Sequence, residues 1–217
     1  MCEAYNIRYG TDFIAVMPTN LYGPNDNFNL TGGHVMPSLM RRIHLGKLLE
    51  DGDMEGIRAD LQRRPVDGFD GHEAEPDIIN LLEKHSIRSS EKSQIIVTVW
   101  GTGKPFREFM YSGDMADATV YIMEKVSFKD LRGEGSEVRN THINIGTGEE
   151  ITIKDLAGLL KETTGFKGIL EFDHSKPDGT PRKFLDSSKL HRLGFRHATS
   201  LKEGAGKMYE WYLQNRQ

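Results

Sequence analysis

The order of hydrophobic and polar positions along the chain predicts strands that alternate with helices. Apolar residues three or four positions apart predict helices over 34–49, 115–126, 153–164, 187–193 and 201–215. Short apolar or β-branched runs predict strands over 12–18, 95–100, 106–111, 142–146 and 169–172, and the first of these is expected to be buried. Alternation of this kind is typical of an α/β fold in which some of the strands pair in parallel.

Two segments depart from this alternation. Residues 1–10 are typical of the end of an amphipathic helix that stops at Gly10. Because nothing upstream begins that helix and a strand follows at once, we expect a chain that begins in mid-fold; a short N-terminal helix is the alternative. Residues 50–94 are charged and poor in aromatic side chains, which predicts a surface insert of two short helices with loops. The segments 19–33 and 128–140 are expected to be loops.

Composition narrows the class of protein. The 217 residues are 37% hydrophobic and 28% charged, as in ordinary globular proteins. The net charge of −4 lacks the basic excess of a general nucleic-acid binder. No apolar run approaches the ~20 residues that span a bilayer, so no membrane segment is expected. The single cysteine, Cys2, excludes an intrachain disulfide and a cysteine-cluster zinc site, and it is expected to be a small buried apolar residue.

Candidate chemistry is concentrated in three loops that combine Pro or Gly with basic or polar residues. These loops are 18–24, 100–109 and 175–183. Ligands of α/β proteins bind at loops that follow the carboxyl ends of strands. Arg107, Arg182 and Lys183, together with Arg42, therefore predict a cationic cleft for a diphosphate. The eight histidines are scattered singly, so no metal site is expected.

A set of motifs carries a family resemblance. PTNLYGP, HVMPSLMRR, VWGTGKPFREFMY, HINIGTG and SKPDGTPRK occur in this order along the chain. In this combination they closely resemble the GDP-L-fucose synthases, a group within the NAD-dependent epimerase/dehydratase branch of the extended short-chain dehydrogenase/reductases. The resemblance covers the chain apart from the insert at 50–94, but only the C-terminal part of the family's protein. It places the family's glycine-rich turn, catalytic serine and Tyr-x-x-x-Lys pair before Met1.

The resemblance implies a Rossmann-type, doubly wound α/β domain with a smaller substrate-binding lobe. Residues 1–34 would be the last part of the dinucleotide-binding domain. Residues 35–217 would form mainly the substrate lobe, with some segments returning to the Rossmann sheet. If the central strands are supplied elsewhere, strand 12–18 has an uncovered edge, so marginal stability or self-association is expected.

The resemblance also implies a reaction. The family epimerises C3 and C5 of GDP-4-keto-6-deoxy-D-mannose and then reduces the C4 ketone with NADPH. Protons on C3 and C5 are acidic because both carbons flank the ketone, and a histidine with a pKa near ~6.5 suits the delivery of a proton to the opposite face. His34 matches the family's acid. Taken by itself, a lone histidine at a helix start is more often a cap or a surface residue.

The remaining site residues follow from the same resemblance. The NADP(H) contacts would be Pro18, Thr19, Asn20, Leu21 and His34. The GDP-sugar contacts would be Arg42, Trp100, Arg107, Asp178 and Lys183. Plainer interpretations remain open: Asn20 in a strand-ending turn, Arg42 on a solvated helix face with Arg41 as the contact instead, and Trp100 in the core. Asp114 and Asp117 are expected to cap and charge the first turn of helix 115–126.

The function implied is GDP-L-fucose synthesis, with this chain supplying the substrate lobe and the epimerase histidine. The alternatives are an inactive nucleotide-sugar-binding fragment and another NAD-dependent nucleotide-sugar epimerase or dehydratase. Because the resemblance places the hydride-transfer residues outside these 217 residues, the isolated chain is expected to lack reductase activity. A homodimer and a cytoplasmic location are also expected.

Overall fold

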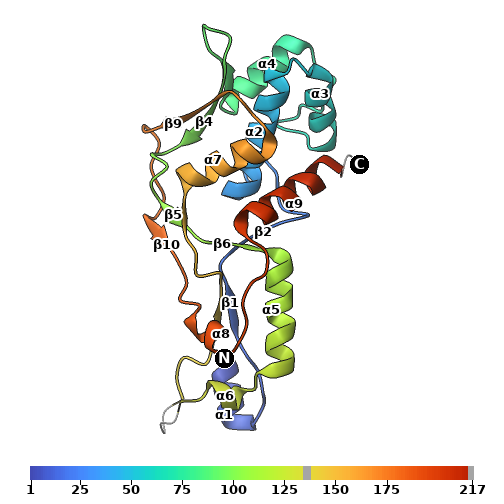
Figure 1. The fold of residues 1–217 in the computed structure, drawn as a ribbon. Helices are drawn as coiled ribbons and strands as arrows, with labels where there is room; N and C mark the ends of the chain where they lie inside the picture. The colour runs from blue at the N-terminus through green and yellow to red at the C-terminus, as the bar shows by residue number, and fades with distance from the viewer. Residues whose placement is uncertain (134–137, 215–217) are drawn as a thin grey trace. The chain divides into compact units, whose positions relative to one another are not determined.

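The computed structural model describes residues 1–133 and 138–214 as a mixed α/β protein, as the sequence predicts (Figure 1). The chain divides into two compact units. Unit 1 contains residues 1–21, 107–150 and 183–201, and unit 2 contains residues 22–106, 151–182 and 202–217. The chain passes between them within the short strands β2 (Asn20–Tyr22), β5 (Phe106–Arg107) and β10 (Arg182–Lys183), just before β8 (Ile151–Thr152), and after residue 201. A boundary at residue 34 between a dinucleotide domain and a substrate lobe stays a prediction.

Unit 1 is built on a parallel strand pair. Its elements are α1 (Cys2–Tyr9), β1 (Val16–Pro18), β6 (Phe109–Tyr111), α5 (Ser112–Lys125), α6 (Phe128–Leu131), β7 (Ile143–Ile145) and α8 (Ser188–Arg192). β1 pairs with β7 in parallel, with Val16 opposite Ile143. The core lies between this pair and the inner faces of α5 and α8, where Ala118, Ile122 and Leu190 are buried.

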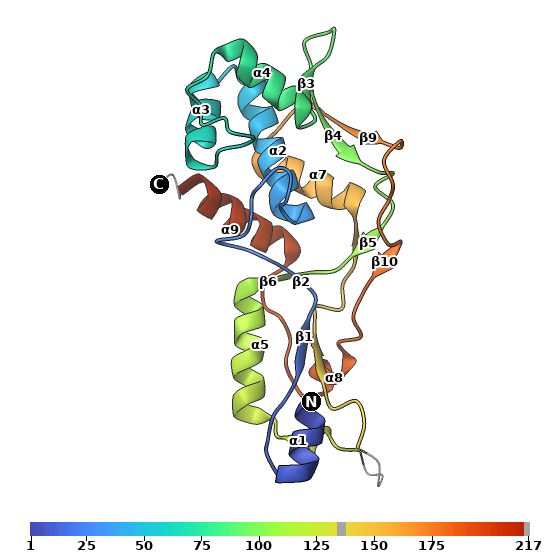
Figure 2. The ribbon, with the colours of Figure 1, turned by 180° about the vertical axis from the view of Figure 1, so that it is seen from behind.

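Unit 2 places helices against a three-stranded sheet (Figure 2). Its strands are β3 (Ile87–Ser89), β4 (Ile95–Trp100) and β9 (Ile169–Asp173), and its helices are α2 (Val35–Glu50), α3 (Met54–Arg63), α4 (Glu75–Lys84), α7 (Ile153–Thr164) and α9 (Leu201–Gln214). β4 is central, antiparallel to β3 and parallel to β9. Helix α2 crosses β4 so closely that a Cβ at Gly46 would lie 2.7 Å from the Val97 side chain.

The helix with the clearest local signals was predicted at its observed bounds. α7 begins after Thr152, whose hydroxyl accepts the Asp155 N–H at 3.0 Å. It ends at Gly165, which adopts a left-handed conformation with φ of 79°. Both end signals lie within the segment itself, so no distant partner was needed to predict them.

The predicted strand over 12–18 is wrong in extent and burial. The strand covers Val16–Pro18, and Met17 is 54% exposed. The reason is local, because the Asn6 side chain accepts the Phe13 N–H at 2.9 Å and donates to the Phe13 carbonyl at 2.7 Å. These bonds tie the backbone of Phe13 to α1 and keep it out of a β-ladder.

Other element predictions need smaller corrections. The strand over 106–111 is interrupted at Glu108, whose side chain is fully buried, and splits into β5 and β6. Strand β2 lies within the predicted loop 19–33, and α6 lies within the predicted loop 128–140. Residues 134–137 of the latter loop and position 215 of the last helix lie outside the described residues. Cys2 is half-buried rather than buried.

The predicted surface insert is also corrected. It does contain two short helices, α3 and α4, but both carry core residues of unit 2. Ile57, Leu61 and Ile78 are fully buried. Asp60 is 1% exposed and forms an ion pair with Arg41 of α2 at 2.7 Å. The segment is therefore part of the hydrophobic core and not a solvated addition.

Asp114 lies in the first turn of α5 and carries an acidic group there as predicted, but it does not cap the helix. Its buried carboxylate accepts the backbone N–H groups of Ala198 at 3.1 Å and Thr199 at 3.0 Å. The residue before the helix is Tyr111, which makes no side-chain cap. Asp114 thus holds the 198–199 segment against α5, while Asp117 is exposed.

Tyr209 of α9 should make unit 2 sensitive to alkaline pH. Its hydroxyl lies 2.9 Å from His44 Nδ1, and burial raises the pKa of Tyr209 to about 12. Because the folded-state pKa lies above the ordinary ~10 of tyrosine, this stabilisation is complete below pH ~10 and is lost as pH rises toward 12. Between pH 9 and 11, wild type should lose about 1 kcal/mol more unfolding free energy than Tyr209→Phe.

Urea denaturation at a series of pH values measures this difference. Tyr9→Phe, at a position that is 68% exposed in α1, is the matched control and should follow wild type. Parallel pH profiles for wild type and Tyr209→Phe would contradict the prediction.

Candidate functional sites of the two units

His34 stands directly before α2 in unit 2. Its side chain is 83% exposed, and Nδ1 lies 3.9 Å from the Asp26 carboxylate. It makes no side-chain capping bond to the helix, so of the two plainer interpretations the local cap does not apply, whereas the surface position does. Among the described residues the second Asp26 oxygen, Oδ2, is buried without a hydrogen-bond partner. The arrangement presents an imidazole to solvent beside a carboxylate, which suits proton transfer to a bound molecule.

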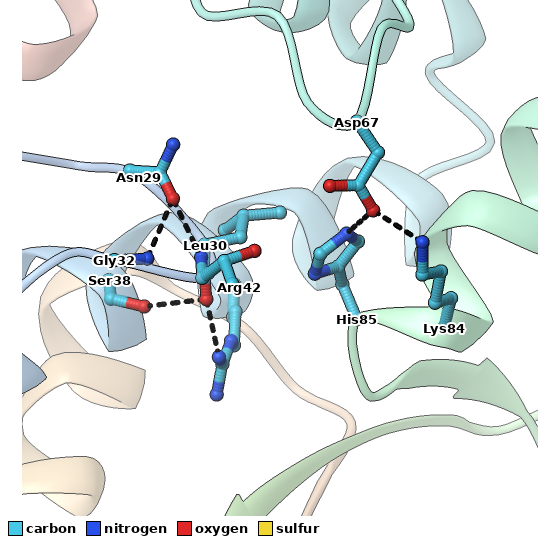
Figure 3. A network of polar contacts seen from close by, with 9 residues as sticks. Asn29, Leu30, Gly32, Ser38, Arg42, Asp67, Lys84 and His85 are labelled. Carbon is cyan, nitrogen blue, oxygen red and sulfur yellow. Dashed lines mark hydrogen bonds and ion pairs between the residues drawn. The ribbon is translucent and has the colours of Figure 1, made fainter.

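The loop before His34 is held by its own side chains and by α2 (Figure 3). Asn29 Oδ1 accepts the N–H groups of Thr31 and Gly32, both at 2.8 Å. The Leu30 carbonyl accepts Arg42 Nη2 at 2.7 Å and the Ser38 hydroxyl at 3.4 Å. Two side chains of α2 therefore fix the loop that leads into His34.

Arg42 also approaches Trp100, which ends β4. The Arg42 guanidinium carbon lies 6.0 Å from the centre of the Trp100 ring, and Lys176 Nζ lies 5.8 Å from the same centre. Burial lowers the pKa of Arg42, and its Nε atom has no partner within the described part of the chain. Trp100 is 59% exposed, which excludes the core interpretation. The exposed ring can stack on a planar group of a ligand, and the two cations beside it can bind an anionic group of the same ligand.

Arg41, the alternative to Arg42 as a substrate contact, is buried in the interior of unit 2. It is 1% exposed and its guanidinium is paired with Asp60. Of the two neighbouring arginines, Arg42 is the one with an unpaired donor. Its contact with a GDP-sugar stays a prediction.

Asp178 ties two loops of unit 2 together. Its carboxylate accepts the Thr102 N–H at 2.8 Å and the Thr102 hydroxyl at 2.7 Å. These hydrogen bonds hold the pKa of Asp178 below its usual range. Gly101, at φ of 84°, is required there because a Cβ would lie 2.3 Å from the Asp178 carboxylate. Asp178 thus shapes the turn that follows Trp100.

In unit 1 the residues predicted to bind cofactor and diphosphate come together in part. Asn20 Nδ2 donates to the Glu108 carbonyl at 2.7 Å, and Asn20 Oδ1 accepts Lys183 Nζ at 3.4 Å. The Thr19 hydroxyl donates to the same Glu108 carbonyl at 3.4 Å. Within residues 1–133 and 138–214, the Asn20 amide uses one of its two N–H groups and one of its two oxygen lone pairs. The remaining N–H and lone pair together fit a carboxamide such as that of nicotinamide.

The other predicted residues of unit 1 lie in varied surroundings. Pro18 is exposed and Leu21 packs against the core, while Arg107 is half-buried. Arg107 and Lys183 belong to unit 1, whereas Arg42 and Arg182 belong to unit 2. A single cationic cleft that contains all four stays a prediction.

Sequence reasoning missed Glu108. It is fully buried, and its carboxylate accepts hydrogen bonds from three backbone or hydroxyl groups of unit 1. The available signal was an acidic residue among the apolar residues of the predicted strand FREFMY, which also contains Arg107, since a buried carboxylate requires compensating partners.

Two further polar side chains, Tyr121 and Asp67, hold segments of the fold together. Tyr121 and Lys125 on α5 have Tyr-x-x-x-Lys spacing, but the Tyr121 hydroxyl donates to the Leu193 carbonyl at 2.6 Å. In unit 2, Asp67 binds Lys84 Nζ at 2.7 Å and His85 Nε2 at 2.9 Å (Figure 3), and these bonds lower the pKa of Asp67. The latter cluster fastens the 64–71 turn to the end of α4.

Neither a metal site nor a membrane span is found within residues 1–133 and 138–214. Nowhere in these ranges do three or more His, Cys, Asp or Glu side chains gather in a way that could hold a metal ion. None of the described helices combines the length and apolar character that crossing a bilayer requires.

Comparison with known proteins decides the family. The model of the NAD dependent epimerase/dehydratase family matches residues 1–61 and 67–146, more than half of the chain. The chain belongs to this family. Among curated relatives, GDP-L-fucose synthase 1 of Arabidopsis thaliana is 42% identical over 99% of this chain and 50% of its own length. GDP-L-fucose synthase of Escherichia coli (strain K12) is 39% identical over 99% of this chain and 53% of its own length.

Solved structures of two GDP-heptose reductases resemble this chain in fold. A GDP-6-OMe-4-keto-L-xylo-heptose reductase from C. jejuni has a TM-score of 0.85 and 41% identity over 99% of this chain and 57% of its own. MlghC, a GDP-mannoheptose C4 reductase from Campylobacter jejuni with NADP bound, has a TM-score of 0.79 and 40% identity over 98% of this chain and 56% of its own. These proteins and the curated relatives are all named for GDP-sugars. The chain spans about half the length of the curated relatives it matches.

Proposed function

We propose that this chain serves GDP-L-fucose synthesis, which is the 3,5-epimerisation and NADPH-dependent 4-reduction of GDP-4-keto-6-deoxy-D-mannose. The observation that carries the proposal is the solvent-facing His34 before α2, in a chain that is 42% identical to a GDP-L-fucose synthase. The proposed role of His34 is to deliver a proton to C3 and C5 of the enolate formed beside the ketone. Asp26, 3.9 Å away, is suited to face the imidazolium form.

Substrate and cofactor roles are proposed unit by unit. In unit 2, Trp100 would stack on a planar part of the GDP-sugar and Arg42 would face its diphosphate, with Asp178 holding the adjoining turn. In unit 1, Arg107 and Lys183 would bind diphosphate oxygens.

For the cofactor, Asn20 would hold the nicotinamide carboxamide, supported by Pro18, Thr19 and Leu21. His34 is proposed separately as an NADPH contact. NADPH, when bound, supplies the hydride for reduction. We further propose a homodimer and a cytoplasmic location, and light scattering of the purified chain tests the former.

These 217 residues alone are proposed to bind GDP-sugar without oxidising NADPH. The resemblance assigns no hydride-transfer Tyr-Lys pair to them, and Tyr121, which has the spacing, is engaged with the Leu193 carbonyl. Calorimetric titration with GDP-mannose, and absorbance at 340 nm with NADPH and the keto-sugar, test the two parts. Failure to bind GDP-mannose would overturn the binding role, and NADPH loss above background would overturn the lack of reductase activity.

A GDP-heptose C4 reductase is the second candidate. It is favoured by the solved neighbours at 40–41% identity, whose names specify reduction of GDP-heptoses. Competition binding with GDP-mannose and a GDP-heptose separates the two. Tighter binding of the heptose, which carries one more carbon beyond C6, would favour the second candidate.

A further inference from the structure

Glu108 is a fully buried carboxylate that the proposed chemistry does not use. Its Oε1 accepts the Gly148 N–H at 2.8 Å and the Thr147 hydroxyl at 3.3 Å, and its Oε2 accepts the Leu185 N–H at 3.3 Å. Burial of a charge is costly unless hydrogen bonds compensate it, and here three donors do so. The side chain thus joins the turn after β7 to the segment that follows Lys183.

The backbone of the same residue holds the Asn20 amide. The Glu108 carbonyl accepts Asn20 Nδ2 at 2.7 Å, which turns Asn20 Oδ1 toward Lys183 Nζ at 3.4 Å. A carbonyl can only accept and an ammonium can only donate, so the two neighbours together fix which way the amide points. All of these residues belong to unit 1.

We propose that Glu108 is a positioning residue that presents Asn20 and Lys183 as one connected pair, so that a nucleoside diphosphate bound at Lys183 is sensed by Asn20. The inference rests on the proposed function for the roles of Asn20 and Lys183. It adds that these two binding groups, which contact each other at 3.4 Å, are held in place by a residue to which no ligand contact is assigned.

The donor pattern around the carboxylate makes the role specific. The Gly148 and Leu185 N–H groups, which face Oε1 and Oε2, can only donate, whereas the Thr147 hydroxyl has both Glu108 Oε1 at 3.3 Å and the Glu149 carbonyl at 3.5 Å as acceptors. A glutamine at 108 would offer one acceptor and one donor to two N–H groups that each require an acceptor. In one orientation the amide NH₂ group would face the Gly148 N–H, and in the other it would face the Leu185 N–H. A Cβ at Gly146 would lie 2.4 Å from Oε1, so the carboxylate is tightly packed there.

The test uses the whole chain and GDP as the probe. Two-dimensional ¹H–¹⁵N NMR follows the side-chain amide of Asn20 and the backbone amide of Gly148, and calorimetry gives the GDP affinity. In wild type, GDP should shift the Asn20 side-chain signals. In Glu108→Gln, the Asn20 and Gly148 signals should move before any ligand is added, GDP should no longer shift Asn20, and affinity should fall about tenfold.

Two variants separate positioning from general stability. Glu108→Asp keeps an acceptor-only carboxylate and should recover part of the GDP-induced shift of Asn20. Glu124→Gln removes the same charge at an exposed position of α5 and should leave both readouts unchanged. If Glu108 only stabilises the fold, Glu108→Gln should have a lower melting temperature. At temperatures well below that melting temperature, its GDP affinity and its Asn20 signals should equal those of wild type.

The outcomes also separate this inference from the proposed function. GDP binding by wild type, with unaltered Asn20 signals and affinity in Glu108→Gln, would overturn the positioning role alone. Absence of GDP binding by wild type would overturn both the diphosphate role and the coupling.

Discussion

Replacing Asp60 by alanine should lower the free energy of unfolding by about 3–5 kcal/mol. Asp60 Oδ1 accepts Arg41 Nε at 2.8 Å and Nη2 at 2.7 Å, and its second oxygen accepts the Tyr212 hydroxyl. Arg41 and Asp60 are each 1% exposed. Removal of the carboxylate leaves a guanidinium in the interior without its counter-charge, and this is the costly way to break a buried pair.

Urea denaturation measures the loss, with a matched control and a rescue. Glu83→Ala, an exposed acid of α4, should change stability by less than about 0.5 kcal/mol. The double variant Arg41→Met with Asp60→Leu removes both charges and should recover most of the lost stability. A loss below about 1 kcal/mol for Asp60→Ala would show that Arg41 finds other partners or water.

This ion pair explains why the sequence misled on residues 50–94. An aspartate in a charged, aromatic-poor segment is typical of a solvated surface. Its partners lie 19 residues before it on α2 and 152 residues after it on α9. The pattern of polar and apolar residues within a segment cannot identify partners so far away in the sequence. The burial of Asp60 is therefore seen only in the folded structure.

Features that depend on local signals were predicted well. α7 has its N-cap and its left-handed glycine within its own segment, and its bounds were confirmed. β4 was confirmed because a run of β-branched residues ends at a glycine turn. The strand predicted over 12–18 is confined to Val16–Pro18, because the Asn6 side chain of the preceding helix takes the backbone hydrogen bonds of Phe13.

The candidate sites show the same division. Motif order identified the family and pointed to His34, but it could not show that the imidazole is exposed beside Asp26. Nor could it show that Trp100 faces solvent rather than the core. Glu108 was missed because its role depends on three donors from segments around residues 147 and 185.

Gly33 should be the position at which the His34 loop is most sensitive to a single added methyl group. A Cβ there would lie 2.4 Å from the Asn29 carbonyl oxygen and 2.5 Å from that of Asn27. Both obstacles are backbone atoms, which cannot rotate away as a side chain can. Gly33→Ala should therefore cost about 2–3 kcal/mol of unfolding free energy, as overpacking does. It should also displace His34, the next residue.

Gly32→Ala is the matched control for this prediction. The nearest atom to a Cβ at Gly32 is Asn29 Oδ1 at 3.9 Å, so the same methyl group fits one residue earlier. Its effect on stability should stay within about 0.5 kcal/mol. The His34 Cε1–H NMR signal should move in Gly33→Ala and stay in place in Gly32→Ala. Equal behaviour of the two variants would mean that the loop yields to the added group, and that Asn29 and Arg42 do not hold His34 in a fixed place.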